Sequence, residues 1–250
     1  ATKKVIKYLE KLAVPVEGDM INNVATISAN NDTDLGNVIA EAFKEVGKNG
    51  VVTMEVSNDS NTSYEVINGA AIDKPLKNFH FITNESKKEA VLENPLVLLV
   101  ENKIENIRKI QSVLEYVIKN NKPLLIIGEA DEQVVSALAM NKMKGNIKVN
   151  IIDTPDFGIY RKQKLQDLAL LTGATVVNED LGDDLDMIEV ELLGTCLKSI
   201  TNSEETIIQV ENTSKEVQEV INEIKVELEN EVLPGHINRL EKRLGLLSCK

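Results

Sequence analysis

Asp156-Phe157-Gly158 is the stretch of this sequence whose residue types first suggest chemistry, because such a triplet holds magnesium in protein kinases. Three cationic residues, Arg161, Lys162 and Lys164, follow it in a chain whose formal net charge is -12. A kinase also needs a glycine-rich phosphate loop, a strand lysine and an HRD-type loop, and the sequence contains none of these. A phosphate site and a turn between a strand and a helix remain as the other two interpretations.

Motifs that bind nucleotides or activate nucleophiles are also missing. The turn at 126–132 has a glycine, but Glu129 and Asp131 beside it would repel the pyrophosphate that a dinucleotide fingerprint holds. No GxxxxGK[ST] phosphate loop occurs, so we expect no nucleotide site. The carboxylates at 179–184 read most simply as an acidic loop, and no histidine partner for a nucleophilic serine is evident.

Composition narrows the class of protein further. The 250 residues suggest one or two domains, and 42% hydrophobic with 27% charged residues is typical of a soluble protein with a core. The acidic balance and the 3% aromatic content argue against a nucleic-acid partner. Two histidines exclude a His-rich metal site, and Cys196 and Cys249 favour free thiols in a reducing compartment. No signal peptide or membrane-spanning run is visible.

Between residues 95 and 178, short apolar runs alternate with helical patterns, which is typical of a parallel sheet covered on both faces. We expect strands at 96–101, 123–129, 147–153 and 174–178, separated by helices at 104–119, 131–144 and 160–172. Outside this region we expect strands at 51–56, 195–201 and 205–210 and helices at 35–46 and 213–230. The fold class is therefore α/β, a mixed sheet with flanking helices.

Amphipathic helical patterns reach both ends of the sequence, at 5–12 and 237–247. Trimmed tails on a complete domain would explain this. A stable domain rarely begins and stops inside such helices, however, so we favour a piece of a longer protein.

The helices expected at 104–119 and 131–144 carry more apolar residues than one buried stripe requires. Burial under other parts of the chain is one explanation. The other is an apolar groove between the two helices that binds protein, and Met140 and Met143 suit such a groove because methionine adapts its shape.

The stretch VATISANNDTDLGNVIAEAFKEVGKNGVVTMEV, at 24–56, closely resembles group I chaperonins of the GroEL type. The match continues through ENPLVLLVENKIENIRKIQSVLE, KPLLIIGE, KVNIIDTPDFGIYRKQKLQDLALLTGATVV, TIIQV and LEKRLGLLS. The resemblance implies an intermediate domain formed from both ends of the chain, 1–67 and 209–250, and an apical domain at 68–208. The equatorial domain would be absent. The resemblance also implies that Pro155 to Gly158 form a turn between a strand and a helix, without kinase chemistry or a phosphate site, and that Arg161 and Lys162 lie on a solvated face or pair between subunits.

In that family, non-native polypeptide and the co-chaperonin mobile loop bind between two apical helices and an extended segment. The resemblance carries this role to Gln111, Leu114, Val135, Ala139 and Met140 on the helices, and to Leu76, Asn78, His80 and Phe81 on the segment. Gln111 and His80 depart from the apolar or aromatic residues usual there, so we expect weaker apolar binding, with Leu114, Val135, Met140 and Phe81 preserving part of the surface.

Pro15 and Gly69 match the family's hinge residues, whereas the returning strand has Gln209 to Asn212 where glycines are usual. An aspartate that assists ATP hydrolysis in the family has no counterpart between Leu233 and Lys250. These departures place the hinge and the ATPase cycle of the full-length protein in question.

The resemblance implies an ATP-dependent molecular chaperone that assists folding and refolding, of which this piece binds unfolded protein and a GroES-type co-chaperonin. ATP and magnesium are expected only for the full-length protein, which would assemble with itself as a seven-fold ring. This piece is expected to have no cofactor and no ATPase activity. We expect bacterial cytoplasm or an organelle, mitochondrial matrix or plastid stroma, with an organelle slightly favoured. A peptide-binding or scaffold module that has lost the ATPase cycle is the alternative, and a Rossmann-type enzyme is a third possibility.

Overall fold

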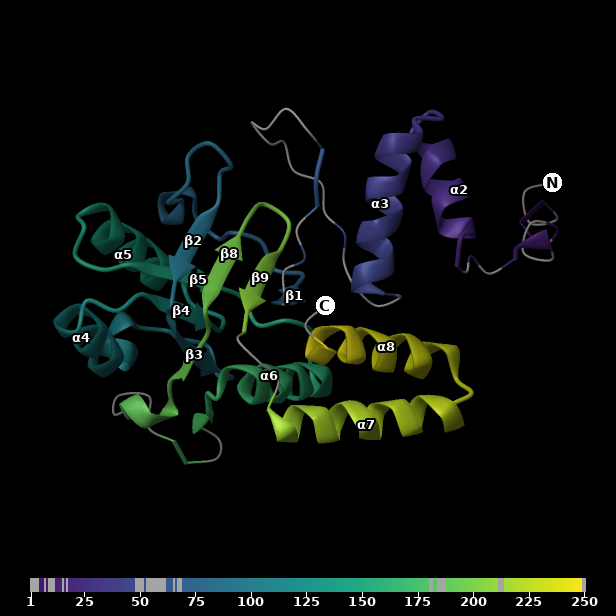
Figure 1. Ribbon diagram of the computed structural model, residues 1–250. Helices are drawn as coiled ribbons and strands as arrows, with labels where there is room; N and C mark the ends of the chain where they lie inside the picture. Colours follow the sequence, from purple (N-terminus) through teal and green to yellow (C-terminus); the bar gives the residue numbers. More distant parts are fainter. Residues whose placement is uncertain are drawn as a thin grey trace. The chain divides into compact units, whose positions relative to one another are not determined.

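The computed structural model describes residues 5, 6, 8, 12–14, 16, 18–47, 52, 62–64, 66, 69–179, 182, 183, 188–210 and 214–248. The chain divides into two compact units, Ala1–Val66 and Ile67–Lys250. Figure 1 labels helices of the first unit and the strands and helices of the second. The expected strand at 51–56 and the expected helix at 5–12 fall largely outside the described residues.

The first unit contains a hairpin of two helices, α2 (Met20–Ser28) and α3 (Thr33–Val46). The side chain of Asp32 caps α3 by accepting hydrogen bonds from two backbone N–H groups of its first turn. Gly36 lies directly against Thr26, because an added Cβ would come within 2.4 Å of the threonine hydroxyl. This close approach fixes where the two helices cross.

The second unit is built around a parallel sheet with the order β5-β4-β3-β6. Its strands are β3 (Leu96–Val100), β4 (Leu124–Ile127), β5 (Val149–Ile152) and β6 (Val176–Val177). β7 (Gly194–Thr195) pairs antiparallel with β3, on Leu96 and Val97. Nearly every residue of the parallel strands is buried, which explains their continuous apolar runs.

An antiparallel sheet lies beside the parallel one, with the order β1-β9-β8-β2. It contains β1 (Gly69–Ile72), β2 (Ala90–Glu93), β8 (Lys198–Thr201) and β9 (Thr206–Gln209). Strands from both ends of the second unit therefore meet in one sheet. The predicted α/β class with mixed sheets and flanking helices is confirmed.

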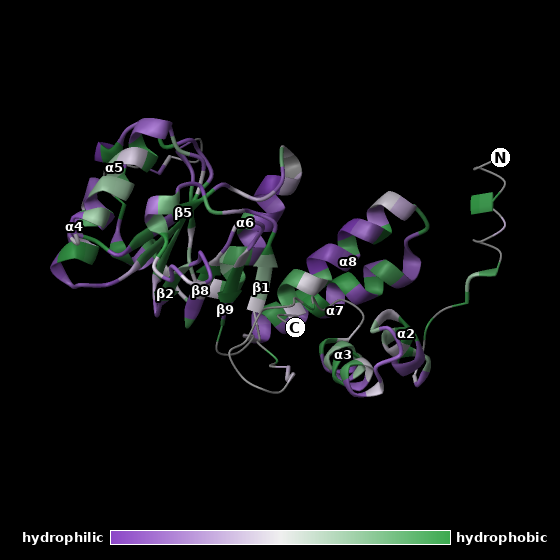
Figure 2. Cartoon of the chain, turned by 90° about the horizontal axis from the view of Figure 1, so that it is seen from above, coloured by the Kyte–Doolittle hydropathy of each residue, from purple (hydrophilic) through white to green (hydrophobic). Residues whose placement is uncertain are grey.

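Helices of the second unit cover the parallel sheet on two sides. One side carries η1 (Phe79–Phe81), η2 (Ile107–Ile110), α4 (Gln111–Lys119) and α5 (Glu132–Met143). The other carries α6 (Ile159–Thr172), α7 (Lys215–Asn230) and α8 (Pro234–Ser248). The short helix η5 (Val190–Leu192) precedes β7. Figure 2 shows hydrophobic and hydrophilic residues interspersed along α7 and α8, as expected of amphipathic helices.

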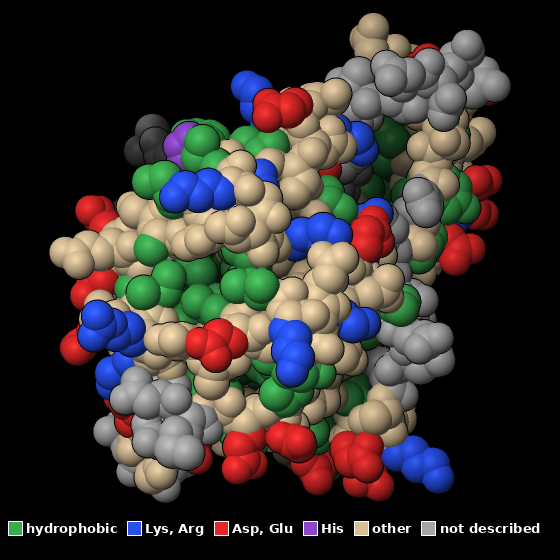
Figure 3. All heavy atoms as spheres, turned by 90° about the vertical axis from the view of Figure 1, so that its left-hand side faces the viewer, with side chains coloured by type: hydrophobic (Ala, Val, Ile, Leu, Met, Phe, Trp, Pro, Cys, Tyr) green, Lys and Arg blue, Asp and Glu red, His purple; other side chains and the backbone are tan. Residues whose placement is uncertain are grey.

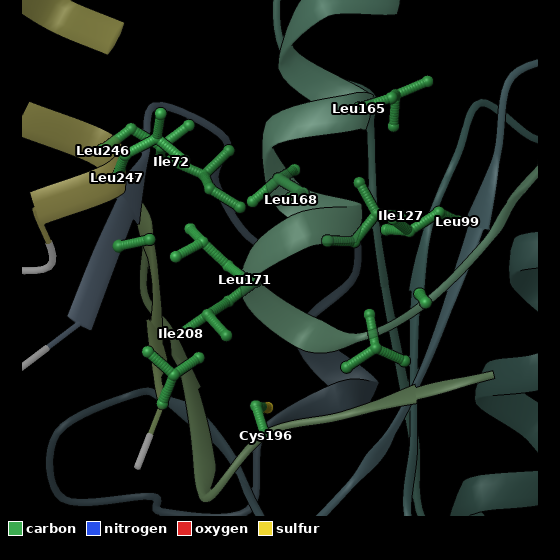
Figure 4. Packing of buried hydrophobic residues seen from close by; sticks show 14 of the residues in the cluster. Ile72, Leu99, Ile127, Leu165, Leu168, Leu171, Cys196, Ile208, Leu246 and Leu247 are labelled. Carbon is green, nitrogen blue, oxygen red and sulfur yellow. The ribbon is translucent and has the colours of Figure 1, made fainter. Parts of the chain in front are cut away.

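Helix α6 lies between the two sheets. Figure 4 shows Leu168 and Leu171 of α6 with Ile208 of the antiparallel sheet on one side and Leu99 and Ile127 of the parallel sheet on the other. Residues of α7 and α8 join the same core cluster. The proposed division of the chain at 1–67, 68–208 and 209–250 stays a prediction. None of the described helices is both long enough and apolar enough to cross a membrane.

Candidate functional site

Helix α5 has one buried side and one apolar side in solvent. Asp131 precedes its first turn, and Val134, Val135, Leu138 and Ala139 pack into the core under it. Met140 and Met143, three residues apart, are 56% and 61% exposed. Residues at this spacing lie on one face of a helix, so the two methionines form one apolar strip.

Helix α4 approaches the same side of the sheet from a short 3₁₀ turn. The side chain of Asn106 accepts a hydrogen bond from Arg108 N at 3.0 Å and starts η2, so the helix expected from residue 104 begins only at 107. Two valines of α4 are buried, whereas Leu114 is half-buried and Ile118 is exposed. α4 therefore also keeps apolar surface in solvent.

The turn η1 is held firmly beside α5. Asn78 Oδ1 accepts a hydrogen bond from His80 N at 2.9 Å and caps the turn. Lys142 Nζ of α5 donates to Ile82 O at 2.5 Å, and the Phe81 ring is fully buried. With the turn fixed in this way, the Phe79 side chain is 79% exposed.

We define the apolar face as the exposed residues Phe79, Ile118, Met140 and Met143, together with the half-buried Leu76 and Leu114, which pack against the core on this side of the sheet. Figure 3 views the side of the molecule that carries α4 and α5, and hydrophobic side chains gather there in several groups, one of them at the centre of the view, with basic and acidic side chains around and between them. The face is thus supported by a buried core and presented by two helices and one tight turn.

The structure brings the predicted site residues to one side of the sheet but exposes only some of them. Met140, Gln111 and His80 are exposed, Leu76 and Leu114 are half-buried, and Asn78 serves as a cap. The expectation that Phe81 and Val135 preserve apolar surface is corrected, because both are buried, and so is Ala139. Their apolar contacts are already taken by the core.

Sequence reasoning missed Phe79. In an extended segment, residues two apart point to the same side, so Phe79 and Phe81 would be equivalent. In a 3₁₀ turn successive residues rotate by roughly 120°, which sends the two rings in different directions. The Asn78 side chain was the available signal, since asparagine commonly caps a turn.

The exposed Gln111 side chain makes a hydrogen bond within α4. Its side-chain amide donates to Glu115 Oε1 at 2.7 Å, one helical turn along α4. This pair lies on the same helix as Leu114 and makes that end of the apolar face polar. The structure therefore supplies a local reason why apolar contact here is weaker than a leucine would give.

The predicted hinge residues remain predictions. Pro15 lies outside the described residues. Gly69 begins β1 and pairs with Gln209 of β9, and an added Cβ would come within 3.0 Å of Ile208 O. The glycine is therefore explained by the close approach of the two strands.

The opening triplet belongs to a turn between β5 and α6. Asp156 and Gly158 both have positive φ, and α6 begins at the next residue. Arg161 donates to Glu101 O and lies 3.4 Å from Glu129 Oε1, while Lys162 lies 3.4 Å from Glu101 Oε1. Arg161 therefore ties α6 to the ends of β3 and β4, which corrects its assignment to a solvated face.

Reactive and metal-binding groups offer no competing site among the described residues. Burial raises the pKa of the Cys196 thiol to about 12, which keeps it protonated and unreactive. Within the ranges that the structure describes, no group of three His, Cys, Asp or Glu side chains is placed to hold a metal ion. No protein-family model matches the chain.

Proposed function

We propose that the second unit binds extended, apolar polypeptide on the apolar face and serves as the substrate-binding part of a molecular chaperone. The observation that carries the proposal is the exposure of four large apolar side chains, from α4, α5 and η1, on one side of a rigid α/β core. Soluble proteins rarely expose contiguous apolar patches of this kind unless a partner covers them.

Two features of the face suit an unfolded chain more than one folded partner. Methionine has three rotatable bonds and a polarisable sulfur, so Met140 and Met143 can adapt to different side chains. Phe79 supplies a large ring on a turn fixed by a buried neighbour and by Lys142. A fixed aromatic anchor beside adaptable residues favours apolar side chains without selecting one sequence.

The chaperonin-like architecture is part of this proposal. The resemblance to group I chaperonins supports it, and the order of strands and helices is compatible with it. On that basis the full-length protein would form an ATP-driven ring, bind a GroES-type co-chaperonin, and work in bacterial cytoplasm or an organelle. A peptide-binding scaffold without an ATPase cycle would use the same face, so the face is the feature to test first.

The first test is charge insertion on the face. Met140→Glu should reduce binding of a fluorescently labelled apolar peptide at least about tenfold, because an unpaired charge is costly to desolvate. Met140 is exposed, so the fold should survive the change. Leu114→Glu should abolish binding but alters a half-buried residue, so its circular dichroism must match the parent.

A matched control uses the opposite side of the second unit. Gln166 is exposed on α6, and Gln166→Glu adds the same charge away from the face. Fluorescence anisotropy should give this variant the affinity of the parent. If folded Met140→Glu and Leu114→Glu bind the peptide as well as Gln166→Glu does, the apolar face is not the binding site.

The second test restores apolar surface. Gln111→Leu removes the polar pair with Glu115 and should strengthen peptide binding by roughly fivefold, the value of one exposed side chain becoming buried. Gln111→Asn keeps the position polar and should bind no more tightly than the parent. Equal affinities for the leucine and asparagine variants would show that bound peptide does not reach this end of α4.

A further inference from the structure

A charged hollow in the described part of the second unit lies between α6 and α8, on the side away from α4 and α5. It has a volume of about 290 Å³. From α6 and the turn before it come Asp156, Tyr160, Gln163, Lys164 and Asp167, and from α8 come Gly235, Asn238, Arg239, Lys242 and Arg243. Four cations and two carboxylates thus surround one space, in a chain with a strongly negative net charge.

The floor of the hollow is rigid. The Asp167 side chain is fully buried and accepts three hydrogen bonds from Arg243, at 2.8, 2.9 and 3.1 Å. This two-pronged geometry neutralises the only buried carboxylate there and fixes α8 against α6. Glu223 and Glu227 of α7 also act on Arg243, but they belong to a separate depression with Val226.

The rim presents cations whose charge is available to a ligand. Arg239 stacks on the Tyr160 ring, with its guanidinium carbon 3.8 Å from the ring centre. Stacking holds the guanidinium plane and leaves its N–H edges free to donate. Among the described residues, no carboxylate lies within ion-pair distance of Arg239 or of the neighbouring Lys242.

The two helices also point the same way along the hollow. Tyr160 contacts Arg239 near the start of both helices, and Asp167 contacts Arg243 further along both. The first turns of both helices therefore face the same end. In α8, Pro234 has no backbone N–H and those of His236 and Ile237 donate to Leu233 O, so the positive end of the helix dipole, and not a row of free donors, is what α8 presents there. Gly158 precedes α6 without a side-chain cap, and Gly235 in the first turn of α8 has open space where a Cβ would be.

From this arrangement we infer that the hollow between α6 and α8 binds the phosphate group of a small phosphate ester. Arg239 supplies a planar pair of donors for two phosphate oxygens, and Lys242 supplies the balancing charge. Lys164 contributes less, because its ammonium lies 3.5 Å from Asp156 Oδ2. The space exceeds that of a phosphate alone, so a short organic group fits beside Asn238 and Gln163. No bond is made or broken.

The test is a titration of the isotope-labelled chain with inorganic phosphate, followed by amide chemical shifts at constant ionic strength. Saturable shifts confined to the segments of α6 and α8 that line the hollow are expected below about 20 mM, the range of weak anion sites. Glycerol 3-phosphate should bind more tightly than inorganic phosphate, because it fills more of the hollow. Equal affinities would remove the ester from the proposal, and shifts that sodium chloride reproduces would overturn the site.

Variants separate a built site from general charge attraction. Arg239→Gln should weaken phosphate binding about tenfold through loss of the two-pronged contact, and Lys242→Gln about threefold. Lys242 is exposed, so this second variant keeps the fold even if the loss of Tyr160 stacking disturbs the first. Lys119→Gln on α4 removes the same charge elsewhere and should change nothing. If all three variants bind phosphate like the parent, the hollow is not an anion site.

Discussion

Helices α5 and α6 follow neighbouring parallel strands and have similar roles in the chain, yet they meet different surroundings. α6 lies between two sheets and packs against α7 and α8, so even a carboxylate, Asp167, is buried on it. α5 is covered on one side only, and its methionines remain in solvent. The number of layers over a helix, more than its composition, decides whether surplus side chains become core or binding surface.

The largest expected effect breaks the charge pair on the covered side. Arg243→Met leaves Asp167 buried without its partner and should lower the free energy of unfolding by about 3–5 kcal/mol. The double variant Asp167→Leu with Arg243→Met should recover most of the loss, because an apolar pair has no charge to desolvate. Urea unfolding of the parent, Arg243→Met and the double variant measures these free energies. A double variant as unstable as Arg243→Met would mean that packing, not charge, holds α8.

This effect should depend on pH. Burial raises the pKa of the Asp167 carboxyl, and hydrogen bonds from Arg243 offset part of that rise. Without Arg243 the folded-state pKa rises further above the unfolded value, so stability from this group is present at low pH and lost as pH increases through the folded pKa. The gap between Arg243→Met and the parent should therefore narrow as pH falls toward about 4. A difference in free energy of unfolding between the parent and Arg243→Met that grows as the pH falls would contradict this account.

A smaller effect tests close packing at the end of α6. An added Cβ on Gly194 of β7 would lie 2.7 Å from both Thr172 O and Ala174 N, which are backbone atoms that cannot move aside easily. Gly194→Ala should cost about 1–3 kcal/mol. Gly235→Ala is the matched control, because nothing lies within 4 Å of its added Cβ. Thermal unfolding should show a clear decrease in Tm for the first and none for the second.

The smallest expected effect lies on the uncovered side. Met143→Ser should change the free energy of unfolding by less than about 0.5 kcal/mol, because the side chain is already mostly in solvent. Leu138→Ala on the same helix should cost about 2–5 kcal/mol, since Leu138 is buried. Urea unfolding measures the free energy of unfolding of both variants and of the parent. A large loss for Met143→Ser would place that methionine in the core and erase the contrast between α5 and α6.

Local patterns predicted the elements of the second unit well. The continuous apolar runs identified β3, β4 and β5, and the helices between them begin and end within a few residues of their expected bounds. The cap that Asp32 forms on α3 is equally local, because its hydrogen bonds span only two or three residues. Such short-range interactions can be predicted from neighbouring residues in the sequence.

The candidate site was harder to predict because exposure depends on layers that the sequence does not display. Val135 and Met140 read alike on α5, and only the packing beneath the helix separates them. Asp167 and Arg243 belong to segments far apart in the chain, so neither the pair nor the hollow above it had a sequence signal. Arg161 was placed on a solvated face because its partner, Glu101 O, is a backbone atom at the end of a distant strand.

Strand β3 has a consequence for how the chain reaches its fold. One edge of β3 pairs with β4, which follows soon after it in the chain. The other edge pairs with β6 and β7, which come much later: Leu99 pairs with Val176, and Val97 pairs with Gly194. At about 5–20 residues per second, synthesis leaves that apolar edge open for several seconds. An open strand edge can pair with another chain. The nascent protein therefore passes through a period in which this open edge makes it prone to aggregation.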